Sequence, residues 1–192
     1  MQQKIEEIRK YAKSVLSEKR FVHTVNVAEE AKRLARIWGA DCEAAYLAGM
    51  AHDIAKEIPF DDVFTMLESY GYVMDACEEE SPAILHAPLG AYILEDKFEI
   101  KNCEILNAIR YHTTGRCDMT LLEKIIYIAD FTEPGRKYPQ AKMVRVISEE
   151  NLEKAVLVQA DEVIKFIIER GNTLHNSTVK MRNYYLTKIK RG

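Results

Sequence analysis

The amino-acid sequence predicts an all-α fold, a single bundle of packed helices. Apolar residues recur three or four positions apart along most of the chain, as in Ile5, Ile8, Ala12 and Leu16 near its start. This spacing places the apolar residues on one face of a helix. Capping and stop residues separate the periodic segments, and no two segments show the strict alternation that paired strands require.

The first half of the chain is expected to supply the centre of the bundle. After the first amphipathic helix, a second is predicted over residues 20–38, where Gly39 supplies a C-terminal stop. The third segment, from residue 42 to about residue 55, is apolar on most sides, which predicts a helix in the middle of the bundle. The dipeptide His52-Asp53 lies near the end of this segment.

The rest of the chain is predicted to continue as helices joined by short breaks. Asp61 and Asp62 open a short helix that Gly71 closes, and the acidic stretch CEEESP that follows is typical of a solvated loop. Further helices are expected over residues 87–98, 102–112, 119–131, 149–170 and 178–190. The breaks SPAILHAP, YHTTGRCD, FTEPGRKYP and RGNTLHNST are expected to converge on one face, which is where function is expected.

Length and composition limit the classes of protein that the chain can belong to. Its 192 residues, 47% hydrophobic and 30% charged, predict one folded domain over residues 1–192. A net charge of -3 provides no general attraction for nucleic acid or an anionic membrane. The sequence has no apolar run of bilayer length. Four scattered cysteines and no signal segment are typical of a cytoplasmic protein.

Histidines and aspartates suggest a metal site at the centre of the bundle. In His52-Asp53, an imidazole and a carboxylate at adjacent positions near a helix end can both reach one cation. Two ligands alone hold a metal poorly, so further ligands are needed. The other candidates, in chain order, are His23, His86, His112 and Asp130.

The position of Asp130 strengthens the interpretation as a metal site. This residue follows the apolar run LLEKIIYIA, so its carboxylate lies beside buried surface. Burying a charge without a partner costs roughly several kcal/mol, and a bound cation or an arginine would remove that cost. The same reasoning applies to Asp53. A simpler reading is that Asp53 ends a helix by chance and that Asp130 caps a turn.

The ligand types indicate a catalytic metal rather than a structural one. Imidazole and carboxylate ligands without thiolate suit iron, manganese, cobalt or zinc, and they do not form a cysteine cage. One metal lowers the pKa of bound water towards about 7, and two metals can clamp a phosphoryl group. Hydrolysis of a phosphate ester or phosphoanhydride is the predicted chemistry.

Three basic residues, Arg20, Lys56 and Arg136, lie close in sequence to the candidate ligands. Lys56 shares a helix face with His52 and Asp53 if the helix persists that far. Arginine makes bidentate contacts with phosphate oxygens, whereas lysine acts as a point charge. We expect these residues to bind phosphate; the alternative for Arg136, and for Lys137 beside it, is a solvated loop charge.

The order of these motifs resembles a known family. RFVHT, AHDIAKE and IADFTEP resemble the motifs of the HD-domain metal-dependent phosphohydrolases. More narrowly, the chain is similar to the YqeK-type bacterial HD proteins, a branch that contains symmetrical diadenosine tetraphosphate hydrolases. The resemblance covers nearly the whole chain. It is carried by RFVHTVNVA, YLAGMAHDIAKEIP, HAPLGAYI, IRYHTTGR, KIIYIADFTEPGR and NTLHNSTVKMRNYY.

The resemblance implies a role for each matching residue. It implies one or two ions, with iron preferred over manganese, cobalt or zinc, and catalytic roles for His52, Asp53 and Lys56. The implied metal ligands are His23, His52, Asp53 and Asp130, with His86 and His112 as ligands of a second ion or as phosphate contacts. The implied substrate contacts are Arg20, His23, Lys56, His86, His112, Thr113, Arg136, Asn172, Thr173, Leu174, His175, Asn176 and Ser177.

The predicted reaction is hydrolysis of diadenosine tetraphosphate to two ADP, and the resemblance supplies the adenine and the symmetrical cleavage. Three alternatives remain at this point: another HD-type nucleotide phosphatase or phosphodiesterase, a nucleotide-sensing module without turnover, and an iron oxygenase. The basic residues argue against the oxygenase. The expected ligand is a dinucleoside polyphosphate or an ADP-like nucleotide. A homodimer is a weaker expectation, based on the amphipathic first helix.

Overall fold

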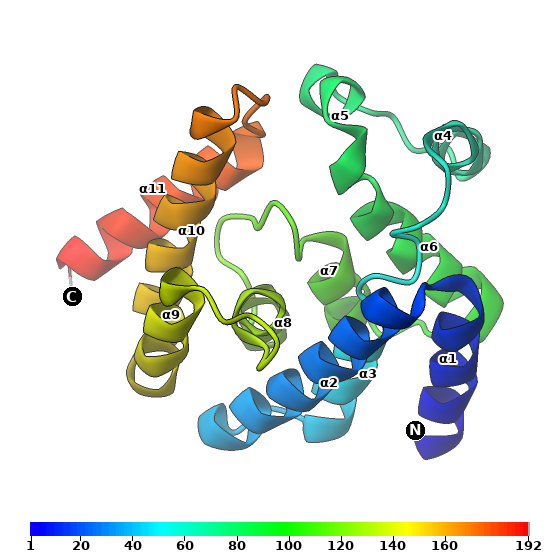
Figure 1. Ribbon diagram of the computed structural model, residues 1–192, viewed down its shortest axis with the longest axis horizontal. Coiled ribbons are helices and arrows are strands. Elements are labelled where there is room, and N and C mark those ends of the chain that lie inside the picture. The colour runs from blue at the N-terminus through cyan, green and yellow to red at the C-terminus, as the bar shows by residue number, and fades with distance from the viewer. Residues whose placement is uncertain (192) are drawn as a thin grey trace.

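A computed structural model describes residues 1–191 of the chain, and in this range every regular element is a helix. This confirms the predicted all-α fold class. Figure 1 shows the helices packed around α8, with the two termini at opposite sides of the view. The elements are α1 (Gln2–Val15), α2 (Glu18–Trp38), α3 (Cys42–Ala51), α4 (Phe60–Ser69), α5 (Ala76–Glu80), the 3-10 helix η1 (Pro82–Ile84), α6 (His86–Phe98), α7 (Cys103–Arg110), α8 (Leu121–Thr132), α9 (Pro139–Glu150), α10 (Leu152–Glu169) and α11 (Asn176–Arg191).

Helices α2 and α3 form the most extensive helix pair in the core. Gly39, with φ of 71°, ends α2 in the left-handed conformation that glycine adopts without strain. Two residues later the Asp41 side chain caps α3 by accepting hydrogen bonds from the backbone N–H groups of Glu43 and Ala44. The two helices approach most closely at Gly49, where a Cβ atom would lie 2.7 Å from Cα of Ala28.

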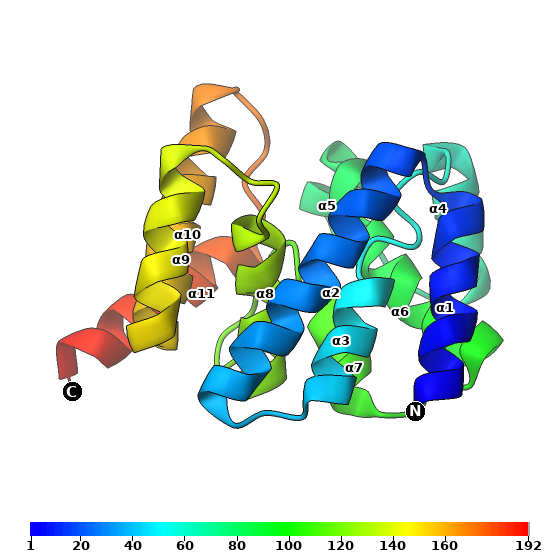
Figure 2. The same ribbon diagram turned by 60° about the horizontal axis from the view of Figure 1, so that its bottom comes forward.

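Helix α8 lies at the centre of the bundle: eight of its twelve residues are buried and the other four are partly buried. A capping box begins it: the Thr120 side chain accepts from the Glu123 backbone, and the Glu123 carboxylate accepts from the Thr120 N–H group. Helices α2, α3, α7, α9 and α10 all pack against α8. Figure 2 shows α8 between the α9–α10 pair on one side and α2, α3 and α7 on the other.

The C-terminal helices extend the core beyond α8. Helix α9 packs on α8 and α2, and α10 packs on α8, α9 and α11. The Trp38 indole N–H group donates to the backbone oxygen of Ser148 at 2.9 Å, which ties the end of α2 to α9. Trp38 is partly buried and packs against the core.

The acidic stretch predicted as a loop is instead a short helix, α5. The Asp75 side chain accepts from the backbone of Cys77 and Glu78, and the Glu78 carboxylate accepts in return from the Asp75 N–H group. Acidic side chains in a first helical turn also interact favourably with the positive end of the helix dipole. The loop prediction was wrong because it missed the capping box between Asp75 and Glu78, although Glu79 and Glu80 are exposed to solvent.

Three other features of the helices differ from the predictions. The segment expected as one helix over residues 149–170 is split, because α9 ends at Glu150 and the Asn151 side chain caps the start of α10. Helix α9 was missed, and Pro139 occupies its first turn, where a missing N–H group has no cost. Helix α3 ends at Ala51 rather than near residue 55, and the chain continues in turns that contain i to i+3 hydrogen bonds.

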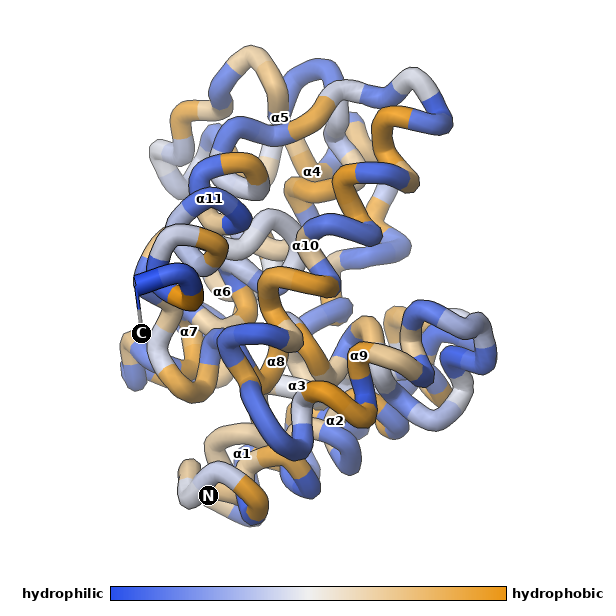
Figure 3. Tube along the Cα trace, turned by 90° about the vertical axis from the view of Figure 1, so that its left-hand side faces the viewer, coloured by the Kyte–Doolittle hydropathy of each residue, from blue (hydrophilic) through white to orange (hydrophobic). Residues whose placement is uncertain are grey.

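The helices are amphipathic, and Figure 3 shows hydrophilic and hydrophobic residues interspersed along their tubes. Their apolar faces meet in one continuous cluster of buried residues that includes side chains of α1, α2, α3, α6, α7, α8 and α10. Over residues 1–191, none of the helices combines the length and the apolar character that crossing a membrane requires.

The close approach of α2 and α3 makes Gly49 sensitive to substitution. A methyl group at this position would collide with the backbone of Ala28, which cannot move without displacing α2. We expect Gly49→Ala to lower the free energy of unfolding by about 1–3 kcal/mol, measured by urea denaturation. Gly90→Ala is the control, because its nearest neighbour would lie at 3.5 Å, an ordinary contact. An equal stability of the two variants would contradict this account.

Candidate metal centre

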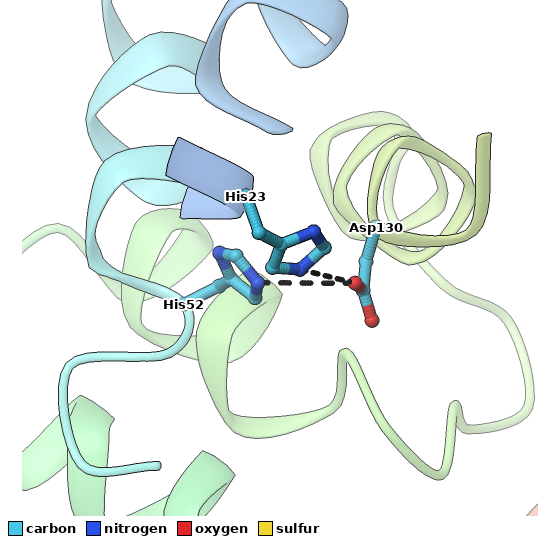
Figure 4. A group of neighbouring side chains, drawn as sticks. All are labelled: His23, His52 and Asp130. Carbon is cyan, nitrogen blue, oxygen red and sulfur yellow. Dashed lines mark ion pairs between the residues drawn. The ribbon is translucent and has the colours of Figure 1, made fainter. Parts of the chain in front are cut away.

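The structure brings four of the predicted ligands together at the meeting point of three helices. His23 lies on α2, His52 and Asp53 follow the end of α3, and Asp130 lies on α8. The Nε2 atom of His23 lies 3.0 Å from Oδ1 of Asp130, and that of His52 lies 3.9 Å from the same oxygen. Figure 4 shows both imidazoles pointing toward the Asp130 carboxylate. One ligand atom from each of these three residues falls within 4.8 Å of the others.

Asp53 lies between this first cluster, which consists of His23, His52 and Asp130, and a second cluster, which consists of His86 and His112. Its Oδ2 atom faces the first cluster, at 3.7 Å from Nε2 of His23 and 3.4 Å from Nε2 of His52. Its Oδ1 atom faces the other way, at 3.1 Å from Nε2 of His86 and 3.9 Å from Nε2 of His112. The two oxygens of one buried carboxylate thus face two different pairs of imidazoles.

Three of the histidines are oriented by the same kind of local hydrogen bond. In each, the Nδ1 atom lies 2.7 Å from the backbone oxygen three residues earlier, so the Nδ1–H group donates to that carbonyl. This bond leaves the Nε2 atom of each ring facing the centre, and an imidazole binds a metal through such an atom when it carries no proton. The three pairs are His52 with Gly49, His86 with Ala83 and His112 with Ile109.

The ring of His23 is oriented instead by a buried carboxylate, that of Glu133, which was not predicted from the sequence as a site residue. The Nδ1 atom of His23 lies 3.2 Å from Oε1 of Glu133, just beyond the end of α8. The other oxygen of Glu133 accepts from the Gly135 N–H group at 2.5 Å. A Cβ atom at Gly135 would lie 2.8 Å from that oxygen, so a glycine leaves room for the carboxylate. From the sequence, FTEPGRKYP was predicted as a break between helices and Glu133 was given no role, although an acidic residue three positions after Asp130 was the available signal.

The arrangement fits a cation. The Nε2 atoms of His23 and His52 are buried and make no hydrogen bond to the described part of the chain, although carboxylate oxygens lie 3.0 Å and 3.4 Å away. Buried polar atoms are nearly always satisfied, so these two atoms point to a partner that is not a protein group. Imidazole nitrogens and carboxylate oxygens suit a divalent transition metal. The histidine and aspartate clusters therefore indicate a divalent-metal site.

The electrostatics of the clusters also favour positive charge. Burial would raise the pKa of Asp53, but the neighbouring His52 and His86 imidazoles outweigh burial and hold this pKa well below its ordinary value. Burial lowers the pKa of His112 to about 3 and also lowers that of His86, so both rings are neutral near pH 7. Burial acts in the same direction on His52, yet the Asp53 charge outweighs it and raises the pKa of that ring.

The three predicted phosphate-binding residues surround the clusters. The Arg20 guanidinium lies 3.0 Å from Oδ2 of Asp53, and that of Arg136 lies 3.4 Å from Oδ1 of Asp130. The Lys56 ammonium lies 3.2 Å from Nδ1 of His86, and burial lowers the pKa of this lysine. Lys56 reaches the site although α3 has ended, because the turns after Ala51 keep it beside the clusters.

A cavity of about 710 Å³ opens beside the clusters, a volume typical of a small-molecule site. Of the predicted site residues, Lys56, His112, Thr113, Asp130 and Arg136 line it. Asp130 is 28% exposed toward solvent, more than the other candidate ligands. None of the described residues in the predicted segment 172–177 lines this cavity.

The predicted substrate segment 172–177 lies against α5 instead. Nε2 of His175 lies 3.4 Å from Oδ2 of Asp75, and the Asn176 amide contacts Sγ of Cys77 at 3.8 Å. The Thr178 hydroxyl donates to the backbone oxygen of Thr114 at 2.9 Å, which connects the segment to the loop that follows α7.

Comparison with known families gives the class of protein. The family model of the HD domain matches residues 20–135, which run from α2 to just beyond α8 and include both clusters. A helical bundle with histidines and aspartates arranged in this way is what that family describes, and the chain belongs to it.

Individual relatives narrow this class. A Staphylococcus aureus protein is 37% identical over 94% of both chains, and a Bacillus subtilis protein is 34% identical over 91% of this chain and 94% of its own. Both carry the name symmetrical bis(5'-nucleosyl)-tetraphosphatase. A crystal structure of a Clostridium acetobutylicum protein, described as a predicted HD superfamily hydrolase involved in NAD metabolism, is 39% identical and matches with a TM-score of 0.93 over 95% of this chain and 97% of its own. Within the HD family, the chain is of the YqeK type that its motifs predicted.

The contact between Glu133 and His23 predicts a supporting role for this carboxylate. Loss of such an outer contact typically weakens metal binding about 10–100-fold, because the imidazole is no longer held in one tautomer and orientation. We expect Glu133→Ala to lower the affinity for added Mn²⁺ or Co²⁺ by this factor and Glu133→Gln to lower it less, measured by titration calorimetry.

The control for this experiment is Glu149→Gln. Glu149 is an exposed glutamate on α9 that pairs with Arg33 and makes no recorded contact with the clusters. Wild-type affinity in Glu133→Ala would show that His23 needs no carboxylate partner.

Proposed function

We propose that this chain is a metal-dependent hydrolase that cleaves diadenosine tetraphosphate symmetrically into two molecules of ADP. The observation that carries the proposal is the pair of clusters divided by Asp53, beside a cavity that Lys56 and Arg136 line. The names of the S. aureus and B. subtilis relatives, which align over almost their full lengths, supply the substrate and the symmetry of cleavage.

The first ion would be held by His23, His52, Asp53 and Asp130, and we propose iron, with manganese, cobalt or zinc as alternatives. When bound, a divalent ion neutralises phosphate charge and activates water for hydrolysis. A second ion would fit the other oxygen of Asp53 together with His86 and His112, since those rings are neutral and present Nε2 atoms to it.

The side chains around the clusters then bind and orient the polyphosphate. Lys56 and Arg136 line the cavity next to Asp130, so phosphate oxygens entering from the cavity would meet both cations. Arg20 approaches Asp53 from α2 at 3.0 Å, so its positive charge also lies within reach of a bound phosphate. Preorganised positive charge of this kind stabilises the negative charge that builds on the departing ADP.

The remaining substrate contacts stay proposals of the same kind. Thr113 lines the cavity and is proposed to contact the nucleotide. The segment 172–177 is proposed to contact the other half of a symmetrical substrate, from its position beside α5. One domain over residues 1–192, a cytoplasmic location and a homodimer also stay predictions.

Product analysis tests the proposed reaction. Purified protein loaded with iron or manganese and mixed with diadenosine tetraphosphate should yield ADP as the only nucleotide product, resolved by ion-exchange chromatography. AMP and ATP in equal amounts would contradict symmetrical cleavage. Asp130→Asn, which removes a charged candidate ligand of nearly the same shape, should abolish the reaction.

Comparison of kcat/KM across a panel of nucleotides separates the proposal from other HD-type activities. A preference for nucleoside monophosphates or cyclic nucleotides would replace the proposed substrate. Tight nucleotide binding with no hydrolysis in the presence of iron, manganese, cobalt or zinc would identify a nucleotide-sensing module instead.

A further inference from the structure

The cavity beside the metal clusters changes character along its length. At one end it is lined by His112, Asp130, Lys56 and Arg136, which belong to or border the clusters. Elsewhere it is lined by the end of α8, the loop between α8 and α9 and the second half of α10. Its walls there include Phe131, Tyr138, Val163, Phe166 and Ile167.

Two of these aromatic rings are exposed to solvent and contribute little to the packing of the core. Phe166 is 53% exposed and Tyr138 is 37% exposed, and Phe166 is absent from the side chains that pack on the core. The buried side chains of α10 lie in its first half, from Leu152 to Ala160. Phe166 lies beyond that stretch, so its ring contributes little to the packing of α10.

Neighbouring groups hold both rings in place. The ring of Tyr138 packs edge-on against Phe131 with the ring centroids 5.4 Å apart, and its hydroxyl lies 3.4 Å from the backbone oxygen of Phe131. The Arg170 guanidinium lies 4.3 Å from the centroid of Phe166. Rings that are already ordered lose little entropy when a ligand packs against them.

The charged side chains along the cavity also differ between its two ends. At the cluster end, Lys56 and Arg136 line the cavity, and Arg136 contacts Asp130 at 3.4 Å and Glu133 at 3.8 Å. Near the aromatic end, Lys165 is paired with Glu162 at 2.6 Å. A nucleotide has the matching arrangement, with an anionic phosphate end and a flat, largely apolar base. A mostly apolar pocket with a few convergent polar groups is typical of such ligand sites.

We propose that Phe166 and Tyr138 form the site that holds one purine base of the substrate, with its phosphates at Lys56 and Arg136. This assignment rests on the proposed function, because it takes a dinucleoside polyphosphate as the ligand. It places one base against α10, away from the segment 172–177. Loss of a base–aromatic contact corresponds to roughly a 10-fold or greater loss of affinity.

The test compares a ligand that has a base with one that has none. Binding of ADP and of pyrophosphate to the Mn²⁺-loaded protein is measured by titration calorimetry, for the wild type and for Phe166→Ala. We expect the variant to bind ADP about 10-fold more weakly and pyrophosphate as well as the wild type does. Phe166→Tyr, which keeps the ring, should restore ADP binding.

Phe60→Ala is the matched control, because Phe60 is also a phenylalanine in a helix, is 51% exposed and does not line the cavity. It should change neither affinity. Tyr138→Ala should weaken ADP binding in the same way as Phe166→Ala. Thermal denaturation confirms that each variant is folded.

Unchanged ADP affinity in both Phe166→Ala and Tyr138→Ala would overturn the proposal, as would an equal loss for ADP and pyrophosphate, which would indicate a disturbed metal site. Failure of the base site is distinct from failure of the proposed function. In the first case the wild type still converts diadenosine tetraphosphate to ADP, and in the second it does not, whatever the variants bind.

Discussion

The structure depends on one electrostatic constraint, the burial of Asp53 among four imidazoles. An isolated carboxylate in the interior would cost several kcal/mol, roughly, and here each oxygen has its own set of partners. Asp130 adds a second carboxylate to the same centre. Neighbouring histidine rings hold the pKa of both carboxyl groups below the ordinary value. The two carboxylates are therefore negatively charged and form a site that attracts a cation.

This constraint explains the construction of the surrounding helices. Three histidines are each oriented by the carbonyl three residues earlier, a contact that helical and turn geometry provides without further cost. Gly49 serves two purposes in this arrangement. It allows α3 to contact the backbone of α2, and its carbonyl orients His52. The core packing and the geometry of the site are therefore not independent.

The cavity extends the same reasoning to the ligand. Positive side chains lie where phosphate would meet the clusters, and exposed aromatic rings lie farther along its walls. Because polar and apolar surfaces are separated in this way, one ligand can satisfy both only if it is charged at one end and flat at the other. A nucleotide meets this condition.

Local pattern was sufficient for the all-α class, for most helix boundaries and for the identity of the histidines and aspartates that meet, because helical periodicity and residue type are properties of short segments. It failed where two readings of the same residues compete, as in the acidic stretch that became α5 and at Asn151, which divides α9 from α10. Glu133 at His23, the two-sided placement of Asp53 and the aromatic rings of the cavity depend on contacts between segments far apart in the chain. Such contacts are set by how the helices pack, and no local pattern encodes them.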